Sequence, residues 1–194
     1  MRLLERCGPA YLQVPGGEPV TLKDTDLSDA EGITRCVAAN ATVLDVCFPG
    51  QTERYRTQRS TRKAIQSLSR APDVAALTIG RRNPEGEESI IGRATVILGS
   101  VACEREVIIE DGINVALWLD EQHWHRGIGR TVLKSLVNHA RQMFDQGQVF
   151  TLVDADNDRS HNMVRAVGFT ADEEARDYEF KGAIYTDSVF YIFS

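Results

Sequence analysis

The chain has 194 residues, with 22 Lys and Arg against 28 Asp and Glu, so its formal net charge at pH 7 is −6. Its length predicts a single domain, and its 42% hydrophobic and 26% charged content excludes a disordered or fibrous chain. The isoelectric point near 5.3 argues against a nucleic-acid binder, because phosphate contacts require a basic face, and it favours a small or cationic partner.

Neither a membrane segment nor a metal site is expected. No apolar run approaches the roughly 18 residues of a membrane span, and the N-terminus lacks the apolar stretch of a signal peptide. The cysteines are scattered, without the spacing of a disulfide framework or a zinc site. We therefore expect a cytoplasmic protein with buried or incidental thiols at Cys7, Cys36, Cys47 and Cys103.

The N-terminal part predicts a lead-in, a strand and a helical region. Residues 1–17 are expected to be a short lead-in, which leaves 18–194 as one domain. A strand is predicted over 20–23. The capping residues of 24–29 then introduce a helical region, which ends at Pro49-Gly50.

A polar helix is predicted over 52–70, because apolar residues occur there only at Ala64, Ile65 and Leu68. Such a polar run is typical of a solvated helix face, and the alternative is the lip of an anion or substrate cleft. The helix carries the basic cluster of the chain, which is Arg54, Arg56, Arg59, Arg62 and Lys63.

From Val74 onward the sequence changes to short apolar runs of the kind that form strands. Turn signals lie at 82–86 and at Asp111-Gly112, and a helix follows Gly127, where apolar residues recur at steps of three and four. A second, short helix is predicted over 160–167. The predicted strands cover residues 74–79, 90–101, 107–109, 113–119, 149–153, 178–180 and 188–193. We expect one α+β unit, of layered α/β type, with a mixed sheet.

The segment from Leu117 to Arg130 carries the most informative pattern. A strand ends, a polar turn follows, and Gly127 and Gly129 stand where a helix begins. Free backbone N–H groups at a helix N-terminus bind anions, and Arg126 and Arg130 add positive charge there. The segment lacks the third glycine of a dinucleotide fingerprint and the Gly-Lys-Ser/Thr of a nucleotide-triphosphate loop.

This segment resembles the acyl-CoA-binding motif of the GNAT acetyltransferase superfamily, Arg/Gln-x-x-Gly-x-Gly/Ala after a strand of alternating apolar residues. Gly127-Ile128-Gly129 match, whereas Trp124 stands in place of the first Arg or Gln. Trp118-Leu119-Asp120 with Trp124 is similar to the RimJ/RimL-type branch of ribosomal-protein N-terminal acetyltransferases. Asn157 to Ser160 and Gly168-Phe169 resemble the Asn-x-x-Ser…Gly-Phe element of that branch.

The resemblance implies a GNAT fold, with a mixed, mostly antiparallel twisted sheet of about seven strands, helices on both faces and a splayed central strand pair. It implies an acetyl-CoA-dependent N-acetyltransferase, in which a primary amine attacks the thioester directly in a ternary complex. It also implies that the pantetheine arm lies along a strand edge and that the pyrophosphate binds the turn. The implied cofactor-binding residues are Leu117, Trp118, Leu119, Trp124, His125, Arg126, Gly127, Ile128, Gly129, Arg130, Asn157 and Ser160.

The residues that would move protons depart from the family pattern. Val164 stands where many members carry a Tyr that protonates the leaving thiolate, so the resemblance gives that role to Ser160, or to Asn157 through a water. The alternative role of both residues is to cap a short helix. Asn114 stands where the branch often has a Glu. The candidate general bases that remain are first Asp111, then Glu110 and Glu121.

The histidines of the turn are expected to face phosphate or solvent. His123 and His125 flank Trp124 without a third ligand nearby, so metal binding is not expected. His161 is expected to be exposed on its helix. Trp118 and Trp124 are expected to pack in the core or against the cofactor.

Other functions stay open at this point. A GNAT-fold module that binds acyl-CoA with weak or no catalysis would explain Asn114 and Val164, and an unrelated α/β phosphate binder would explain the glycine turn alone. The acceptor is open among a protein N-terminus, an amino acid, a polyamine and an aminoglycoside-like amine. The expected partner is a small-molecule or peptide amine, without nucleic acid or membrane, and the protein is expected to be a monomer or homodimer.

Overall fold

The computed structural model describes residues 10–48, 50–82, 86–143, 147–172 and 174–193. They belong to two compact units. The first unit comprises the chain up to Thr95 together with Leu117–Val132, and the second comprises Val96–Ala116 and Leu133–Ser194. No helix in the described ranges is long and apolar enough to cross a membrane.

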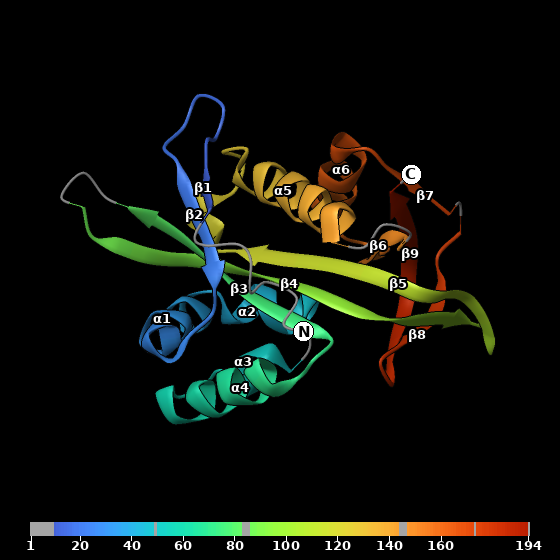
Figure 1. Cartoon of the computed structure of the whole chain (residues 1–194), viewed down its shortest axis with the longest axis horizontal. Helices are drawn as coiled ribbons and strands as arrows, with labels where there is room; N and C mark the ends of the chain where they lie inside the picture. Colours follow the sequence, from blue (N-terminus) through green and yellow to red (C-terminus); the bar gives the residue numbers. More distant parts are fainter. Residues whose placement is uncertain (1–9, 49, 83–85, 144–146, 173, 194) are drawn as a thin grey trace. The chain divides into compact units, whose positions relative to one another are not determined.

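The first unit is built on a sheet with the order β1-β2-β3-β4-β5. Its strands are β1 (Ala10–Leu12), β2 (Val20–Asp24), β3 (Val74–Arg82), the first part of β4 (Glu88–Cys103) and the end of β5 (Glu106–Leu119). The antiparallel register of β2 and β3 places Val20 opposite Arg81. β1 and β2 form a hairpin (Figure 1), so part of the expected lead-in is a strand of the sheet. A domain boundary at residue 18 stays a prediction.

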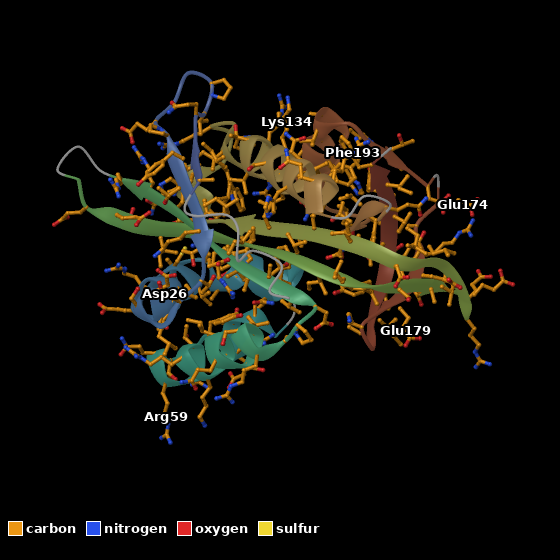
Figure 2. The ribbon with its side chains drawn as sticks, in the orientation of Figure 1. Asp26, Arg59, Lys134, Glu174, Glu179 and Phe193 are labelled. Carbon is orange, nitrogen blue, oxygen red and sulfur yellow. The ribbon has the colours of Figure 1, made fainter. Side chains whose placement is uncertain are left out.

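Short helices connect β2 to β3. They are η1 (Leu27–Asp29), α1 (Ala30–Ala39), α2 (Ala41–Cys47), α3 (Gln51–Arg54) and α4 (Gln58–Arg70). Asp26, at the start of this helical region (Figure 2), accepts a hydrogen bond from the Ser28 N–H, and the Asp29 carboxylate accepts one from the Asp26 N–H. This reciprocal capping box confirms the predicted start of the helical region.

The predicted continuous helix over 52–70 is wrong, because the helix is interrupted between α3 and α4. Thr57 adopts an extended conformation and accepts a hydrogen bond from the Ser60 N–H, so it begins a new helix. The preceding helical region also divides, at Asn40. The Asn40 amide donates to the Cys36 carbonyl over 2.8 Å, a side-chain contact that competes with helical hydrogen bonding.

These helices bury an apolar core within the first unit. Its members include Ile33, Leu44, Tyr55, Ile65 and, from β5, Trp118. Burial of each such side chain contributes roughly 1.5–3 kcal/mol. The thiol of Cys36 also lies in this core, and its burial raises its pKa to about 12.

The second unit continues β4 and β5 and adds further strands and a helix. They are β6 (Val149–Asp154), α6 (Asp158–Val167), β7 (Phe169–Ala171), β8 (Arg176–Phe180) and β9 (Ala183–Phe193). The order is β4-β5-β6-β9-β7, and β8 pairs with both β4 and β9. The sheet is mixed because β6 is parallel to β5 and antiparallel to β9.

β5 is a single strand where the sequence predicted two, over 107–109 and 113–119. It runs through Asp111 and Gly112 without a break, because the sheet pairs both ends of the segment. The actual turn lies at Glu104 and Arg105, where φ angles of 50° and 69° form the two-residue hairpin between β4 and β5. The predicted turn over 82–86 includes residues 83–85, which lie outside the described residues.

The pairing of β5 with β6 is confined to two residue pairs, Ile113 with Val149 and Asn114 with Phe150. β6 nevertheless pairs with β9 along its whole length, from Val149 to Asp154. The two parallel strands therefore part after Asn114, as the expected splayed pair requires. Among the described residues the sheet has nine strands rather than about seven, because β1 and β7 have three residues each and too little pattern to be predicted.

Candidate functional site

The turn after β5 is fixed by hydrogen bonds from its own residues. The Trp124 indole N–H donates to the Leu119 carbonyl over 2.9 Å, and the Asp120 carboxylate accepts from the Gln122 N–H. Between them η2 (Glu121–His123) forms a single turn. The half-buried Trp124 thus braces the turn against the strand that precedes it.

Two other elements of the first unit anchor the same turn. The Asp120 N–H donates to the Ile91 carbonyl of β4 over 2.8 Å. The Glu121 N–H donates to the side-chain oxygen of Asn40, which is 4% exposed and lies between α1 and α2. A buried side chain held at both ends in this way restricts how the turn can move.

The chain then turns sharply into α5 (Ile128–Met143), which begins in the first unit and continues in the second. His125 and Gly127 have φ angles of 57° and 77°, so the backbone is left-handed at both positions. The Thr131 N–H donates to the Gly127 carbonyl, which leaves the N–H groups of residues 128–130 without acceptors inside the helix. Such a turn before a helix N-terminus is the backbone arrangement that binds anions.

A cleft of about 630 Å³ lies at this helix N-terminus, wholly within the first unit. The turn between β1 and β2 and the end of β3 form its other walls. Its lining residues are Val14, Pro15, Gly16, Gly17, Glu18, Arg81, His123, His125, Arg126, Gly127, Ile128, Arg130 and Thr131. The lining is rich in cationic side chains and free N–H groups, which fits the pyrophosphate of acetyl-CoA.

Arg81 and His123 extend the polar lining of the cleft beyond the turn. Arg81 is held by Glu18, whose carboxylate accepts from the Arg81 Nε over 2.6 Å. The Arg81 Nη1 lies 3.5 Å from the His123 Nε2. The His123 Nδ1 is buried and has no hydrogen-bond partner in the described part of the chain. Burial, and also Arg81 and Arg126, lower the pKa of His123 below 6.5, against the opposing effect of Asp120.

We expect His123 to make the protein less stable in acid. Its lowered pKa means that the unfolded chain binds a proton more readily, so the free energy of unfolding falls as the pH drops below about 6.5. One proton limits this slope to about 1.4 kcal/mol per pH unit. His123→Gln should flatten the profile in urea denaturation between pH 5 and 8, and the exposed His125, changed to Gln, is the control. An unchanged slope in the His123 variant would contradict the prediction.

The cofactor-binding residues predicted from the sequence separate into two groups. His125, Arg126, Gly127, Ile128 and Arg130 line the cleft. The other predicted residues of the first unit lie outside the lining. Trp118 is buried in the core, and Trp124 braces the turn through the Leu119 carbonyl. Leu117, Leu119 and Gly129 are also absent from the lining. The basic cluster of 54–63 also contributes no residue to this cleft.

The predicted catalytic residues lie in the second unit. Asn157 is the N-cap of α6, and its side-chain oxygen accepts from the Ser160 N–H over 3.1 Å, so its capping role is present. Ser160 is half-buried in the first turn, and Asp111 is exposed on β5. Val164 and Asn114 are both buried.

The expectation of an exposed His161 is wrong. The residue is 7% exposed, its Nδ1 lies 2.8 Å from the Tyr191 hydroxyl, and its Nε2 lies 3.1 Å from the Ala155 carbonyl. The carbonyl requires the proton on Nε2, so in a neutral imidazole the Tyr191 hydroxyl donates to Nδ1. This pairing ties α6 to β9 and gives His161 a structural role.

Sequence reasoning missed Arg81, Asn40 and the cleft-lining turn of residues 14–18. No local pattern marks them, because each is distant in sequence from the glycine turn. Arg81 reaches the cleft only through the β2–β3 register, and Asn40 reaches the turn through helix packing.

Solved structures of ribosomal-protein acetyltransferases are similar to this chain. RimJ of Mycobacterium smegmatis, in complex with CoA-disulfide, has a TM-score of 0.73 at 19% identity, covering 95% of this chain and 85% of that one. The ribosomal-protein-S5-alanine acetyltransferase of Vibrio fischeri has a TM-score of 0.72 at 16% identity, with 94% and 95% covered. RimL, a ribosomal L7/L12 α-N-protein acetyltransferase in complex with CoA, has a TM-score of 0.70 at 19% identity, with 94% and 97% covered.

These similarities confirm the α+β GNAT fold that the sequence predicted. No curated protein sequence matches the chain. The acetyltransferase (GNAT) domain family matches residues 20–170, which is most of the chain and includes the glycine turn and the start of α6. The chain therefore belongs to the GNAT acetyltransferase family and is an acetyl-CoA-dependent N-acyltransferase.

Proposed function

We propose that the protein transfers an acetyl group from acetyl-CoA to a primary amine, by direct attack of the amine in a ternary complex. The observation that carries this proposal is the cleft at the α5 N-terminus, where free N–H groups, Arg81, Arg126 and Arg130 converge. Acetyl-CoA supplies the activated acetyl thioester, and the chain supplies binding, orientation and proton transfer.

The residues of the cleft would hold the anionic part of the donor. The N–H groups of residues 128–130 and the guanidinium groups of Arg126 and Arg130 are placed to bind pyrophosphate oxygens. Arg81 adds a charge that Glu18 orients. The strand edge of residues 117–119 is the expected contact of the pantetheine arm, as in the family, and Trp124 fixes that edge through the Leu119 carbonyl.

We propose a protein or peptide N-terminus as the acceptor, since the similar enzymes are named for ribosomal proteins. Their low identity leaves small-molecule amines as further candidates. Transfer needs an amine without its extra proton and a donor of a proton to the leaving thiolate. Ser160, with Asn157, is our proposed proton donor, and Asp111 is our proposed general base.

The test of the proposed function measures the free CoA thiol that is released from acetyl-CoA when an amine is added. The panel of amines comprises N-terminal peptides, amino acids, polyamines and aminoglycosides. Turnover with at least one amine supports the proposal. Calorimetry with CoA is run in parallel. CoA binding without acetylation of any amine would instead support a binding module, and equal affinity for ATP and CoA would indicate a general phosphate binder.

Asp111→Asn is expected to reduce kcat at pH 7 by at least about 100-fold, the usual contribution of a general base. Glu110→Gln is the matched control, because Glu110 is the adjacent exposed carboxylate of β5. Initial rates at saturating acetyl-CoA across pH 6–9 would measure both. Near-normal rates in the Asp111 variant would contradict its assignment, and a loss confined to the Glu110 variant would transfer the role to Glu110.

A further inference from the structure

A buried cation of the first unit has no anionic partner among the residues that the structure describes. Arg93 of β4 is 3% exposed, and its Nε and Nη2 have no hydrogen-bond partner among the described residues. Its guanidinium lies over the Tyr55 ring, with Cζ 4.6 Å from the ring centroid. A cation–π contact offsets only part of the cost of removing a guanidinium from water, so this site has unused capacity to bind an acceptor of hydrogen bonds.

A second guanidinium shares the same ring. The Arg54 Cζ lies 5.8 Å from the Tyr55 centroid, and the structure gives Arg54 no ion pair with any described carboxylate. The nearby Arg56 differs, because it pairs with Glu53 over 3.6 Å. Two cations close to one ring repel each other, and an anion bound to them would offset that repulsion.

Arg93 also stands beside the strand edge that we propose holds the donor. The preceding residue, Gly92, packs so closely on β5 that an added Cβ would lie 2.3 Å from the Trp118 carbonyl oxygen. The Ile91 carbonyl accepts the Asp120 N–H. Arg93 thus lies on the stretch of β4 that packs against the end of β5, near residues 117–119, where transfer is proposed to take place.

We infer that Arg93 and Arg54 bind an oxyanion group of the acceptor, so the preferred acceptor is an amine that carries a carboxylate or a phosphate. This inference rests on the proposed function and names its substrate class. Guanidinium groups bind both oxyanions through paired, charge-assisted hydrogen bonds. The net charge of −6 favours a cationic acceptor only at long range, and the buried guanidinium of Arg93, together with the exposed one of Arg54, outweighs it at short range.

The experiment compares matched peptide acceptors that differ in one group at the second residue: Glu against Gln, and phosphoserine against serine. For the wild-type protein, kcat/KM should be at least about tenfold higher for an anionic member of a pair, as expected for charge-assisted hydrogen bonds. The pair that shows the preference identifies carboxylate or phosphate. Arg93→Met should abolish the preference, and Arg54→Gln should reduce it several-fold.

Arg59→Gln is the control, because this substitution removes one positive charge from the basic cluster that also contains Arg54. The Arg59 side chain points away from α4 (Figure 2). Arg93→Met should keep its CoA affinity and its melting temperature, because methionine removes an unpaired buried charge. A preference that survives in Arg93→Met, or no preference in the wild-type protein, overturns the inference while acetylation itself supports the proposed function. Failure of every amine would overturn both.

Discussion

Changing Gly127 to alanine is expected to weaken CoA binding about tenfold, and changing it to valine should weaken binding further. Gly127 has a φ angle of 77°, and a residue with a side chain pays roughly 1–2 kcal/mol to remain there. Space is not the constraint, because an added Cβ would meet only Val14 Cγ1, at 3.6 Å. The backbone would relieve its strain by turning the N–H groups of residues 128–130 away from the bound anion.

Gly182 provides a matched control for this prediction. Its φ angle of 73° is nearly the same, an added Cβ would meet nothing within 4 Å, and it lies in the turn between β8 and β9. Both alanine variants should lose about 1 kcal/mol of stability in urea denaturation. Only Gly127→Ala should lose CoA affinity in calorimetry. Equal CoA affinity in the two variants would contradict the anion-binding role of the turn.

Replacing Ser160 with alanine is expected to lower kcat by about 100-fold or more, because it removes the proposed proton donor to the leaving thiolate. The KM for acetyl-CoA should change by less than about twofold, since a group needed only in the transition state contributes little to ground-state binding. Steady-state rates at several pH values measure both parameters.

The control for Ser160 is Ser60, the serine at the same position of another helix. The Ser160 N–H donates to the Asn157 side chain over 3.1 Å, and the Ser60 N–H donates to the Thr57 side chain over 3.1 Å. Both alanine variants preserve these backbone hydrogen bonds. Ser60→Ala should leave kcat unchanged. A Ser160 variant with normal kcat would reduce that residue to a structural role, in which case Asn157 becomes the residue to test.

The parts of the fold that the sequence predicted well are those with strong local patterns. The capping box at Asp26 and the amphipathic α5 are short-range features, so composition and periodicity identify them. The glycine turn was predicted for the same reason, since its left-handed backbone at Gly127 is a local preference of glycine. Strand ends were predicted less well, because sheet pairing carried β5 through Asp111-Gly112 despite its turn signal.

The positions that local patterns could not identify are joined to the site by tertiary contacts. Arg81 is an ordinary charged residue in the sequence and becomes a wall of the cleft only through the β2–β3 register. Asn40 resembles any helix-ending asparagine until its side chain accepts the Glu121 N–H. In the sequence, Arg93 is one charged residue in an apolar strand. Its burial over Tyr55 depends on how α3 and α4, which flank Tyr55, pack against β4.

By itself, the sequence determined the acidic character of the chain, the glycine turn and the helix that follows it, together with a resemblance that the family match confirmed. Those features depend on residues a few positions apart, whose backbone preferences act without the rest of the protein. Only the tertiary structure decided where positive charge gathers, because the cations that line the cleft come from β3, the turn and α5. It also buried Arg93 without a counter-ion in the described part of the chain, since burial depends on contacts between distant segments.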